Sequence, residues 1–170
     1  MLIGVPKEIK NHEYRIGLTP AGARELVGHG HKVMIQRDGG KSIGLTNEMY
    51  QKAGAEIVET AEEIFRRAEM IIKVKEPQPV EYAMLREGQL LYTYLHLAPD
   101  PAQTKALVAS GVTAIAYETV TDRNGGLPLL APMSEVAGRM SIQAGAHALE
   151  KAQGGSGVLL GGVPGVQPAE

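Results

Sequence analysis

The chain has 170 residues, of which 44% are hydrophobic and 21% are charged, and its formal net charge is -2. These values are typical of a folded globular protein, and they exclude a largely disordered chain and argue against a nucleic-acid-binding protein. Cysteine is absent, which excludes disulfide bonds, thiolate catalysis and thiolate zinc sites.

The opening residues show no basic segment followed by an apolar stretch, and no apolar run reaches about 18 residues. We therefore expect no signal peptide, no membrane partner and a cytoplasmic location.

Short apolar segments alternate with helical ones along the first 120 residues. Capping patterns predict helix starts at Thr19-Pro20, at Thr60-Ala61-Glu62-Glu63 and at Asp100-Pro101, and another short helix is expected over 46–53. The predicted strands are Leu2–Pro6, His31–Gln36, Ala55–Val58, Met70–Lys75, Gln89–Leu97 and Val112–Val120. Strands separated by helices indicate an α/β fold, a Rossmann-like parallel sheet flanked by helices.

The last 40 residues differ in character from the rest. A helix rich in small residues is predicted from Ala131 to about Lys151, and six glycines follow between 154 and 165. The stretch Gly155–Gly161 has the wrong spacing for a dinucleotide fingerprint, and no strand and helix flank it, so we reject it as a phosphate loop. We expect residues 1–130 to form one domain, and 131–170 to form a long linker helix and a hinge.

Four chemically capable side chains follow four predicted strands, whose exits we expect to be neighbours: Arg15, Lys75, His96 and Glu118. Ligands of open parallel sheets bind beyond the carboxyl ends of the strands. An arginine can hold a carboxylate with two hydrogen bonds, a lysine can polarise a carbonyl oxygen, and a histidine can transfer a proton at neutral pH. This combination favours a site for a small 2-oxo acid. No cluster has the spacing of a metal site, and we expect none.

Each of these residues also has a structural interpretation. Arg15 is compatible with a solvated surface charge, and Lys73 and Lys75 with an exposed strand face. His96 fits a hydrogen-bonded residue inside an apolar strand, and Glu118 a helix cap or a loop charge. Tyr92 and Tyr94 are expected to be packing residues with hydrogen-bonded hydroxyls rather than catalysts.

Several long motifs resemble the N-terminal part of the bacterial alanine dehydrogenase family, which is related to pyridine nucleotide transhydrogenases. They are Ile3-Gly4-Val5-Pro6-Lys7-Glu8, Asn11-His12-Glu13-Tyr14-Arg15, Val74-Lys75-Glu76-Pro77, Tyr94-Leu95-His96-Leu97-Ala98, Ala116-Tyr117-Glu118-Thr119-Val120, the run from Leu127 to Arg139 and the glycine-rich tail. The resemblance extends over the whole chain. The segment Arg37–Ser42 departs from the family pattern, which we expect to alter a surface loop only.

The resemblance implies reversible, NAD-dependent oxidative deamination of L-alanine to pyruvate and ammonium. It assigns Arg15 and Lys75 to substrate binding, His96 to proton transfer, and Ser134 and Met133 to NAD binding. It also implies a homo-oligomer, a hexamer in the family, with small-molecule substrates.

In the family a nucleotide-binding domain follows the region that ends here at Glu170. We therefore expect residues 1–130 to be a substrate-binding domain that is incomplete without its C-terminal segment, and the isolated chain to be inactive. Two alternatives stay open: a domain of a transhydrogenase alpha-type subunit, and a non-catalytic substrate domain. The Tyr-Leu-His-Leu-Ala and Val-Lys-Glu-Pro runs favour alanine dehydrogenase.

Overall fold

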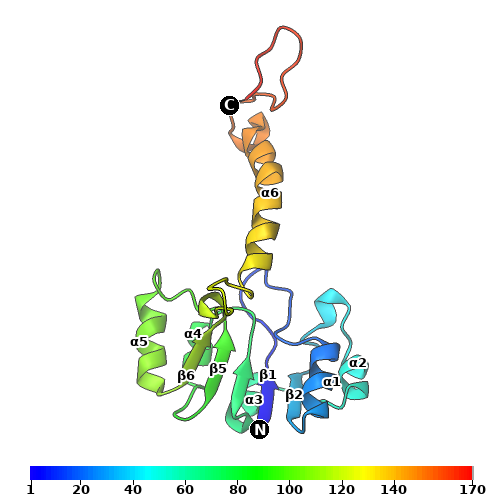
Figure 1. The fold of residues 1–170 in the computed structure, drawn as a ribbon, viewed down its shortest axis with the longest axis vertical. Coiled ribbons are helices and arrows are strands. Elements are labelled where there is room, and N and C mark those ends of the chain that lie inside the picture. The colour runs from blue at the N-terminus through cyan, green and yellow to red at the C-terminus, as the bar shows by residue number, and fades with distance from the viewer. Residues whose placement is uncertain (170) are drawn as a thin grey trace. The chain divides into compact units, whose positions relative to one another are not determined.

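The computed structural model of the chain describes residues 1–169 (Figure 1). It contains two compact units, Met1–Thr119 and Val120–Glu170. The first unit is a six-stranded sheet with helices, and the second is built on one long helix.

The sheet is parallel throughout, as the sequence predicts. Its strands are β1 (Leu2–Val5), β2 (Lys32–Gln36), β3 (Glu56–Val58), β4 (Met70–Ile72), β5 (Leu90–Thr93) and β6 (Thr113–Ala116). The order across the sheet is β3-β2-β1-β4-β5-β6. The chain thus runs outward from β1 to β3 and then returns to place β4 beside β1. In doubly wound sheets this reversal opens a crevice for ligands at the carboxyl ends of the two central strands.

The first unit has five helices, and three of them begin where a capping pattern predicts a helix start. They are α1 (Pro20–Gly28), α2 (Asn47–Lys52), α3 (Ala61–Arg67), α4 (Pro79–Tyr82) and α5 (Pro101–Ser110), with short 3-10 turns η1 (Lys41–Ile43) and η2 (Tyr117–Thr119). The side chains of Thr19, Thr60 and Asp100 each accept a backbone N–H at a helix start. The single turn α4 was not predicted, and its Glu81 carboxylate accepts the N–H of Gln78 at 2.7 Å.

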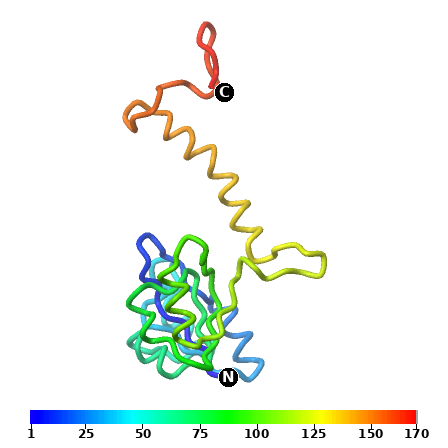
Figure 2. Tube along the Cα trace, turned by 90° about the vertical axis from the view of Figure 1, so that its left-hand side faces the viewer, coloured from blue at the N-terminus to red at the C-terminus, as the bar shows by residue number. Residues whose placement is uncertain are grey.

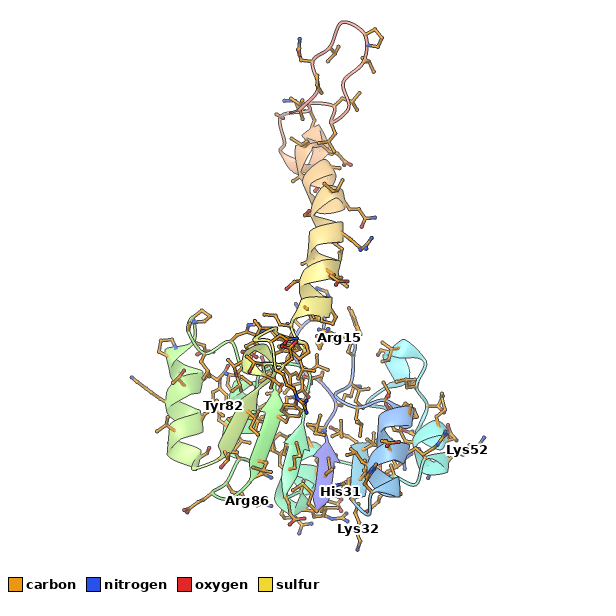
Figure 3. The ribbon with its side chains drawn as sticks, viewed as in Figure 1. Arg15, His31, Lys32, Lys52, Tyr82 and Arg86 are labelled. Atoms are coloured by element: carbon orange, nitrogen blue, oxygen red, sulfur yellow. The ribbon has the colours of Figure 1, made fainter. Side chains whose placement is uncertain are left out.

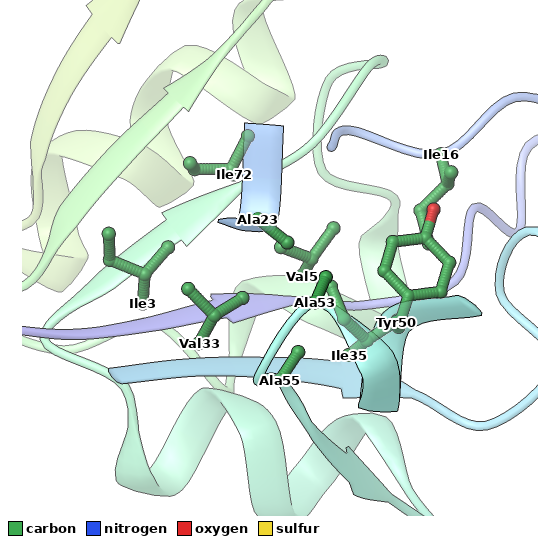
Figure 4. Close-up of a cluster of buried hydrophobic side chains, with 10 residues drawn as sticks. All are labelled: Ile3, Val5, Ile16, Ala23, Val33, Ile35, Tyr50, Ala53, Ala55 and Ile72. Carbon is green, nitrogen blue, oxygen red and sulfur yellow. The ribbon is translucent and has the colours of Figure 1, made fainter. Parts of the chain in front are cut away.

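Apolar side chains fill both faces of the sheet. On one face Ile3 and Val5 pack with α1 and α2 in the cluster shown in Figure 4. On the other face Met34 packs with residues of α3 and α5. Helix α3 approaches β1 so closely that a Cβ added at Gly4 would lie 2.6 Å from a side-chain carbon of Ile64. At the edge of the sheet Ile115 of β6 remains 42% exposed.

Three strands are shorter than predicted. The prediction for β4 extended to Lys75, that for β5 to Leu97 and that for β6 to Val120. Leu95 remains buried beyond the end of β5, and Tyr94 still donates its N–H to the Val74 carbonyl at 3.3 Å. A run of apolar residues indicates that a segment is buried, but it does not show where the segment stops pairing with its neighbour in the sheet. The lengths predicted for these strands were therefore too great.

The unusual segment Arg37–Ser42 forms a braced turn. Asp38 has a positive φ of 58°, and it exchanges two hydrogen bonds of 2.9 Å with the side chain of Asn47. Gly39 and Gly40 are buried although their neighbours Arg37 and Lys41 are exposed. The segment therefore combines buried backbone at its glycines with exposed side chains on either side.

The second unit consists of a loop, the helix α6 (Ala131–Leu149), the short turn η3 (Lys151–Gln153) and a glycine-rich segment (Figure 2). The helix confirms the prediction to within two residues at its end. Between 154 and 169 the described backbone forms turns and one isolated bridge, Val163 with Val166, so the glycine run opens no helix there. None of the helices described within 1–169 has the length and apolar character needed to cross a membrane.

Candidate active site

The loop between β1 and α1 carries Arg15 to the edge of the sheet where the strands end. Figure 3 shows Arg15 at this edge, opposite His31 and Lys32 at the edge where β2 begins. Gly17 lets the loop lie against the end of β4, because a Cβ there would be 2.8 Å from the Ile72 carbonyl oxygen. The reversal of strand order therefore places the Arg15 loop beside the exit of β4.

The Arg15 guanidinium forms a two-point ion pair with Glu13. Its Nε lies 2.8 Å from Glu13 Oε1 and its Nη2 lies 2.6 Å from Oε2, while the Arg15 backbone N–H also donates to Oε1 at 2.9 Å. The hydrogen bonds from Arg15 lower the pKa of Glu13 although burial acts against them, and the charge of Lys75 contributes in the same direction. The positive charges of Arg15 and Lys75 thus both act on the Glu13 carboxylate.

A buried charge cluster lies at the exit of β4. Lys73 Nζ contacts Glu8 Oε2 at 3.1 Å and Glu81 Oε1 at 2.9 Å, and none of the three side chains is more than 2% exposed. The exposed strand face that the sequence allowed for Lys73 is therefore wrong. Glu8 Oε1 also accepts the N–H of Val74 at 2.6 Å and that of Lys75 at 3.3 Å. Burial raises the pKa of Glu8, with Lys73 and these N–H groups acting against it.

Lys75 lies two residues after Lys73 in the chain, and it is partly buried. Its carbonyl accepts the hydroxyl of Thr93 at 2.8 Å, which ties the exit of β4 to the end of β5.

His96 lies three residues beyond β5 rather than inside a strand, and it is exposed. Its ring stacks on that of Tyr94, with centroids 6.2 Å apart and planes 19° from parallel. Tyr94 and Tyr92 both contact Tyr117 edge-on, at 5.0 and 4.3 Å, which confirms that these tyrosines pack. Burial raises the pKa of Tyr94 while the charge of Arg15 acts in the opposite direction, so Arg15 lies within electrostatic reach of Tyr94.

Glu118 lies in η2, just beyond β6, and its carboxylate accepts the backbone N–H groups of Leu95 and His96. It lines a hollow of about 370 Å³ at the exits of β5 and β6. The other lining residues are Leu95, His96, Leu97, Ala98, Pro99, Ala116 and Thr119.

Arg15, Lys75 and His96, to which the resemblance assigns substrate binding and proton transfer, have one feature in common. The backbone N–H of each is bonded to a glutamate carboxylate: Arg15 to Glu13, Lys75 to Glu8 and His96 to Glu118. Sequence reasoning did not assign Glu8 and Glu13 a role. The only signal was their presence inside the motifs that carry Arg15 and the first strand.

The two residues assigned to NAD lie in the second unit, on the first turn of α6. Ser134 is exposed, and its hydroxyl bonds the Leu130 carbonyl at a long 3.4 Å, so it can reorient towards a ligand. Met133 is partly buried. One hydroxyl and one thioether side chain would make too few contacts to hold a whole dinucleotide. Within residues 1–169, no group of three or more His, Asp or Glu side chains is placed to hold a metal ion.

Comparison with known families identifies both parts of the chain. The family described as "Alanine dehydrogenase/PNT, N-terminal domain" matches residues 4–137, and "Alanine dehydrogenase/PNT, C-terminal domain" matches residues 141–170.

Individual proteins give the same result. The alanine dehydrogenase of Methanococcus maripaludis is 62% identical over the whole chain, which covers 46% of that protein. The alanine dehydrogenase of Bacillus subtilis is 55% identical over 98% of the chain and 43% of its own length. The chain thus spans less than half the length of these curated relatives.

Solved structures share the fold. An L-alanine dehydrogenase superposes with a TM-score of 0.84 and 54% identity, over 99% of this chain and 46% of the other. A transhydrogenase from Sinorhizobium meliloti superposes with a TM-score of 0.67 over 72% of this chain and 35% of its own, at 22% identity, a likeness of fold alone.

Proposed function

We propose a function from the premise that this chain belongs to the alanine dehydrogenase/PNT N-terminal-domain family: it forms the substrate-binding part of an NAD-dependent alanine dehydrogenase. In this proposal residues 1–130 bind the substrate, and residues 131–170 connect them to a nucleotide-binding part. By resemblance, the assembled enzyme is a cytoplasmic homo-oligomer.

The observation that carries the proposal is the position of Arg15 and Lys75. They follow β1 and β4, the two strands between which the order of the sheet reverses. Crevices at such points are the usual ligand sites of doubly wound sheets. A lysine and an arginine there favour a small anion. To hold the carboxylate of that anion, Arg15 would exchange at least part of its two-point pair with Glu13.

His96 adds proton transfer to this binding site. Conversion of an amino acid to a 2-oxo acid requires a proton to be taken from water that adds to the imine carbon, and a proton to be given to the departing amine. A ring nitrogen of His96 is suited to both transfers near neutral pH. Lys75 would stabilise negative charge on the substrate oxygen during these steps.

NAD, when bound, accepts the hydride that leaves the α-carbon of alanine. Ser134 and Met133 are the residues of this chain that would contact it. Because they provide only part of a dinucleotide site, and because hydride transfer depends on positioning, we infer that the isolated 170-residue chain does not turn over alanine.

The test uses two proteins. One is this chain alone, and the other is a fusion of this chain to the remaining C-terminal part of the Methanococcus maripaludis relative. NADH formation from L-alanine and NAD is measured at alkaline pH. We expect no turnover by the chain alone, turnover by the fusion, and a loss of about 100-fold or more in the fusion carrying His96→Ala.

The matched control is His29→Ala, at the exposed end of α1, which should leave the fusion unchanged. A His96→Ala fusion as active as the unaltered one would refute the role of His96. NADH formed by the chain alone would show that the remainder of the enzyme is dispensable, and reduction of one nicotinamide nucleotide by another without alanine turnover would favour the transhydrogenase alternative.

A further inference from the structure

The Glu118 carboxylate bonds two successive backbone N–H groups at the exit of β5. The N–H of His96 lies 2.8 Å from Oε1, and that of Leu95 lies 3.0 and 3.2 Å from the two oxygens. Hydrogen bonds to an ionised acceptor are roughly twice as strong as neutral ones. Glu118 therefore fixes the path of the backbone at the residue to which we assign proton transfer.

The backbone of His96 has an uncommon conformation. Its φ is +50°, in the left-handed region that residues other than glycine seldom adopt. Such a conformation persists only when surrounding contacts determine it, and it is more frequent at functional sites. The contact that satisfies the N–H of His96 is the Glu118 carboxylate.

The same 3-10 turn also supports the ring of His96. Tyr117 precedes Glu118 in η2 and contacts Tyr94 edge-on, with ring planes at 89°, and Tyr94 in turn stacks on His96. One short segment after β6 thus contacts both the backbone of His96 and the ring that stacks on it. On the other side of this stretch, the Gln103 side chain donates to the Leu95 carbonyl at 2.7 Å.

We propose that Glu118 is the positioning residue for His96: its carboxylate holds the left-handed backbone turn that presents the imidazole to the substrate. The proposal rests on the function proposed above for His96. Glu118 uses its carboxylate on backbone N–H groups, so it acts through His96 rather than on the substrate.

The ionisation of Glu118 supports this role. Burial raises its pKa, but the N–H groups of His96 and Leu95, together with its own, outweigh burial and hold the pKa below the ordinary value of a glutamate. A positive charge on His96 acts in the same direction on the pKa of Glu118. The carboxylate is therefore ionised, and accepts strongly, throughout the neutral range.

The first test is an NMR measurement on this chain, which does not require activity. In the unaltered chain we expect a strong intraresidue HN–Hα NOE at His96, the signature of a positive φ. We also expect the amide signals of Leu95 and His96 to titrate together, at a pH below the ordinary glutamate range.

Glu118→Ala should weaken that NOE to the level of an ordinary residue. Glu118→Gln, which keeps one acceptor oxygen and so preserves the fold better, should abolish the joint titration. Glu62→Gln, an exposed position on α3, serves as the matched control and should change neither signal. A positive φ that survives in Glu118→Ala would overturn the proposal.

The second test uses the fusion protein. Glu118→Ala should lower kcat by about 100-fold, the effect of misplacing a catalytic group by roughly 1 Å. The KM for alanine should change little, because Arg15 and Lys75 are fixed by other carboxylates. Glu118→Gln should recover part of kcat.

If Glu118→Ala leaves kcat unchanged, or if it lowers kcat/KM only by raising KM, the positioning role is refuted. If His96→Ala leaves the fusion active, the proposed function fails, whereas the NMR result still decides whether Glu118 sets the backbone of His96.

Discussion

Lys73 is the cation between two buried carboxylates, and its removal should destabilise the first unit strongly. In Lys73→Met the hydrophobic stem is retained, but Glu8 and Glu81 lose a partner at 3.1 and 2.9 Å. Breaking a buried ion pair by deleting one member costs about 3–5 kcal/mol, because a charge remains buried without compensation. Backbone N–H groups still donate to both carboxylates. We therefore expect the free energy of unfolding to fall by about 4 kcal/mol, the cost of one broken pair rather than of two.

Urea unfolding of the 170-residue chain, followed by circular dichroism, measures this loss. With a denaturant slope of about 2 kcal/mol per molar, the midpoint should fall by about 2 M. The matched control is Lys105→Met, an exposed lysine on α5, which should change the free energy of unfolding by no more than about 0.5 kcal/mol.

A triple variant separates charge from packing. Combining Lys73→Met with Glu8→Gln and Glu81→Gln removes every charge of the cluster, so it should be less destabilised than Lys73→Met alone. The reasoning is wrong if Lys73→Met costs no more than Lys105→Met, or if the triple variant is the least stable of the set.

Three further predictions follow from individual contacts. Gly4→Ala should lower the free energy of unfolding by about 1–3 kcal/mol, because its Cβ would lie 2.6 Å from a side-chain carbon of α3. The control Gly28→Ala, whose Cβ would have no neighbour within 4 Å, should not lower it. The midpoints of urea unfolding compare the two variants. Thr60→Ala should cost about 1 kcal/mol in the same assay through loss of the α3 cap, and Thr60→Ser should restore it. The pKa of Glu13 is lowered by Arg15, so the pair stabilises the fold above the ordinary glutamate pKa of about 4.3, and this contribution is lost as the pH falls through the lowered value. A carboxylate NMR titration checks this, and Arg15→Gln should return the midpoint of Glu13 upward.

The sequence predicted the elements of the fold better than their arrangement. Local signals located the caps at Thr19, Thr60 and Asp100, since a cap depends on residues three positions apart. The strand order depends instead on which faces pack together, and no local signal revealed that β4 lies beside β1. The expectation that Arg15, Lys75, His96 and Glu118 lie at neighbouring strand exits is nevertheless confirmed, because β1, β4, β5 and β6 are adjacent in the sheet.

The buried lysine illustrates a second limit. Lys73 and Lys75 are separated by one residue and look alike in the sequence, yet Lys73 is fully buried while Lys75 is only partly so. The difference arises from Glu8 and Glu81, which are 65 and 8 residues away from Lys73. A charged residue is buried where distant partners compensate it, and a single sequence does not identify those partners.

The sheet and the glutamates contribute to the candidate site in different ways. Parallel strands bring their exits to one edge, but they fix only where each loop begins. At this edge the backbone N–H of Arg15, Lys75 and His96 is each held by a carboxylate from elsewhere in the chain or loop. In the function proposed above, a glutamate that accepts these backbone N–H groups would orient a substrate-binding or proton-transferring residue through its backbone. Sensitivity to substitution should therefore extend to these glutamates, which composition alone would classify as ordinary surface charges.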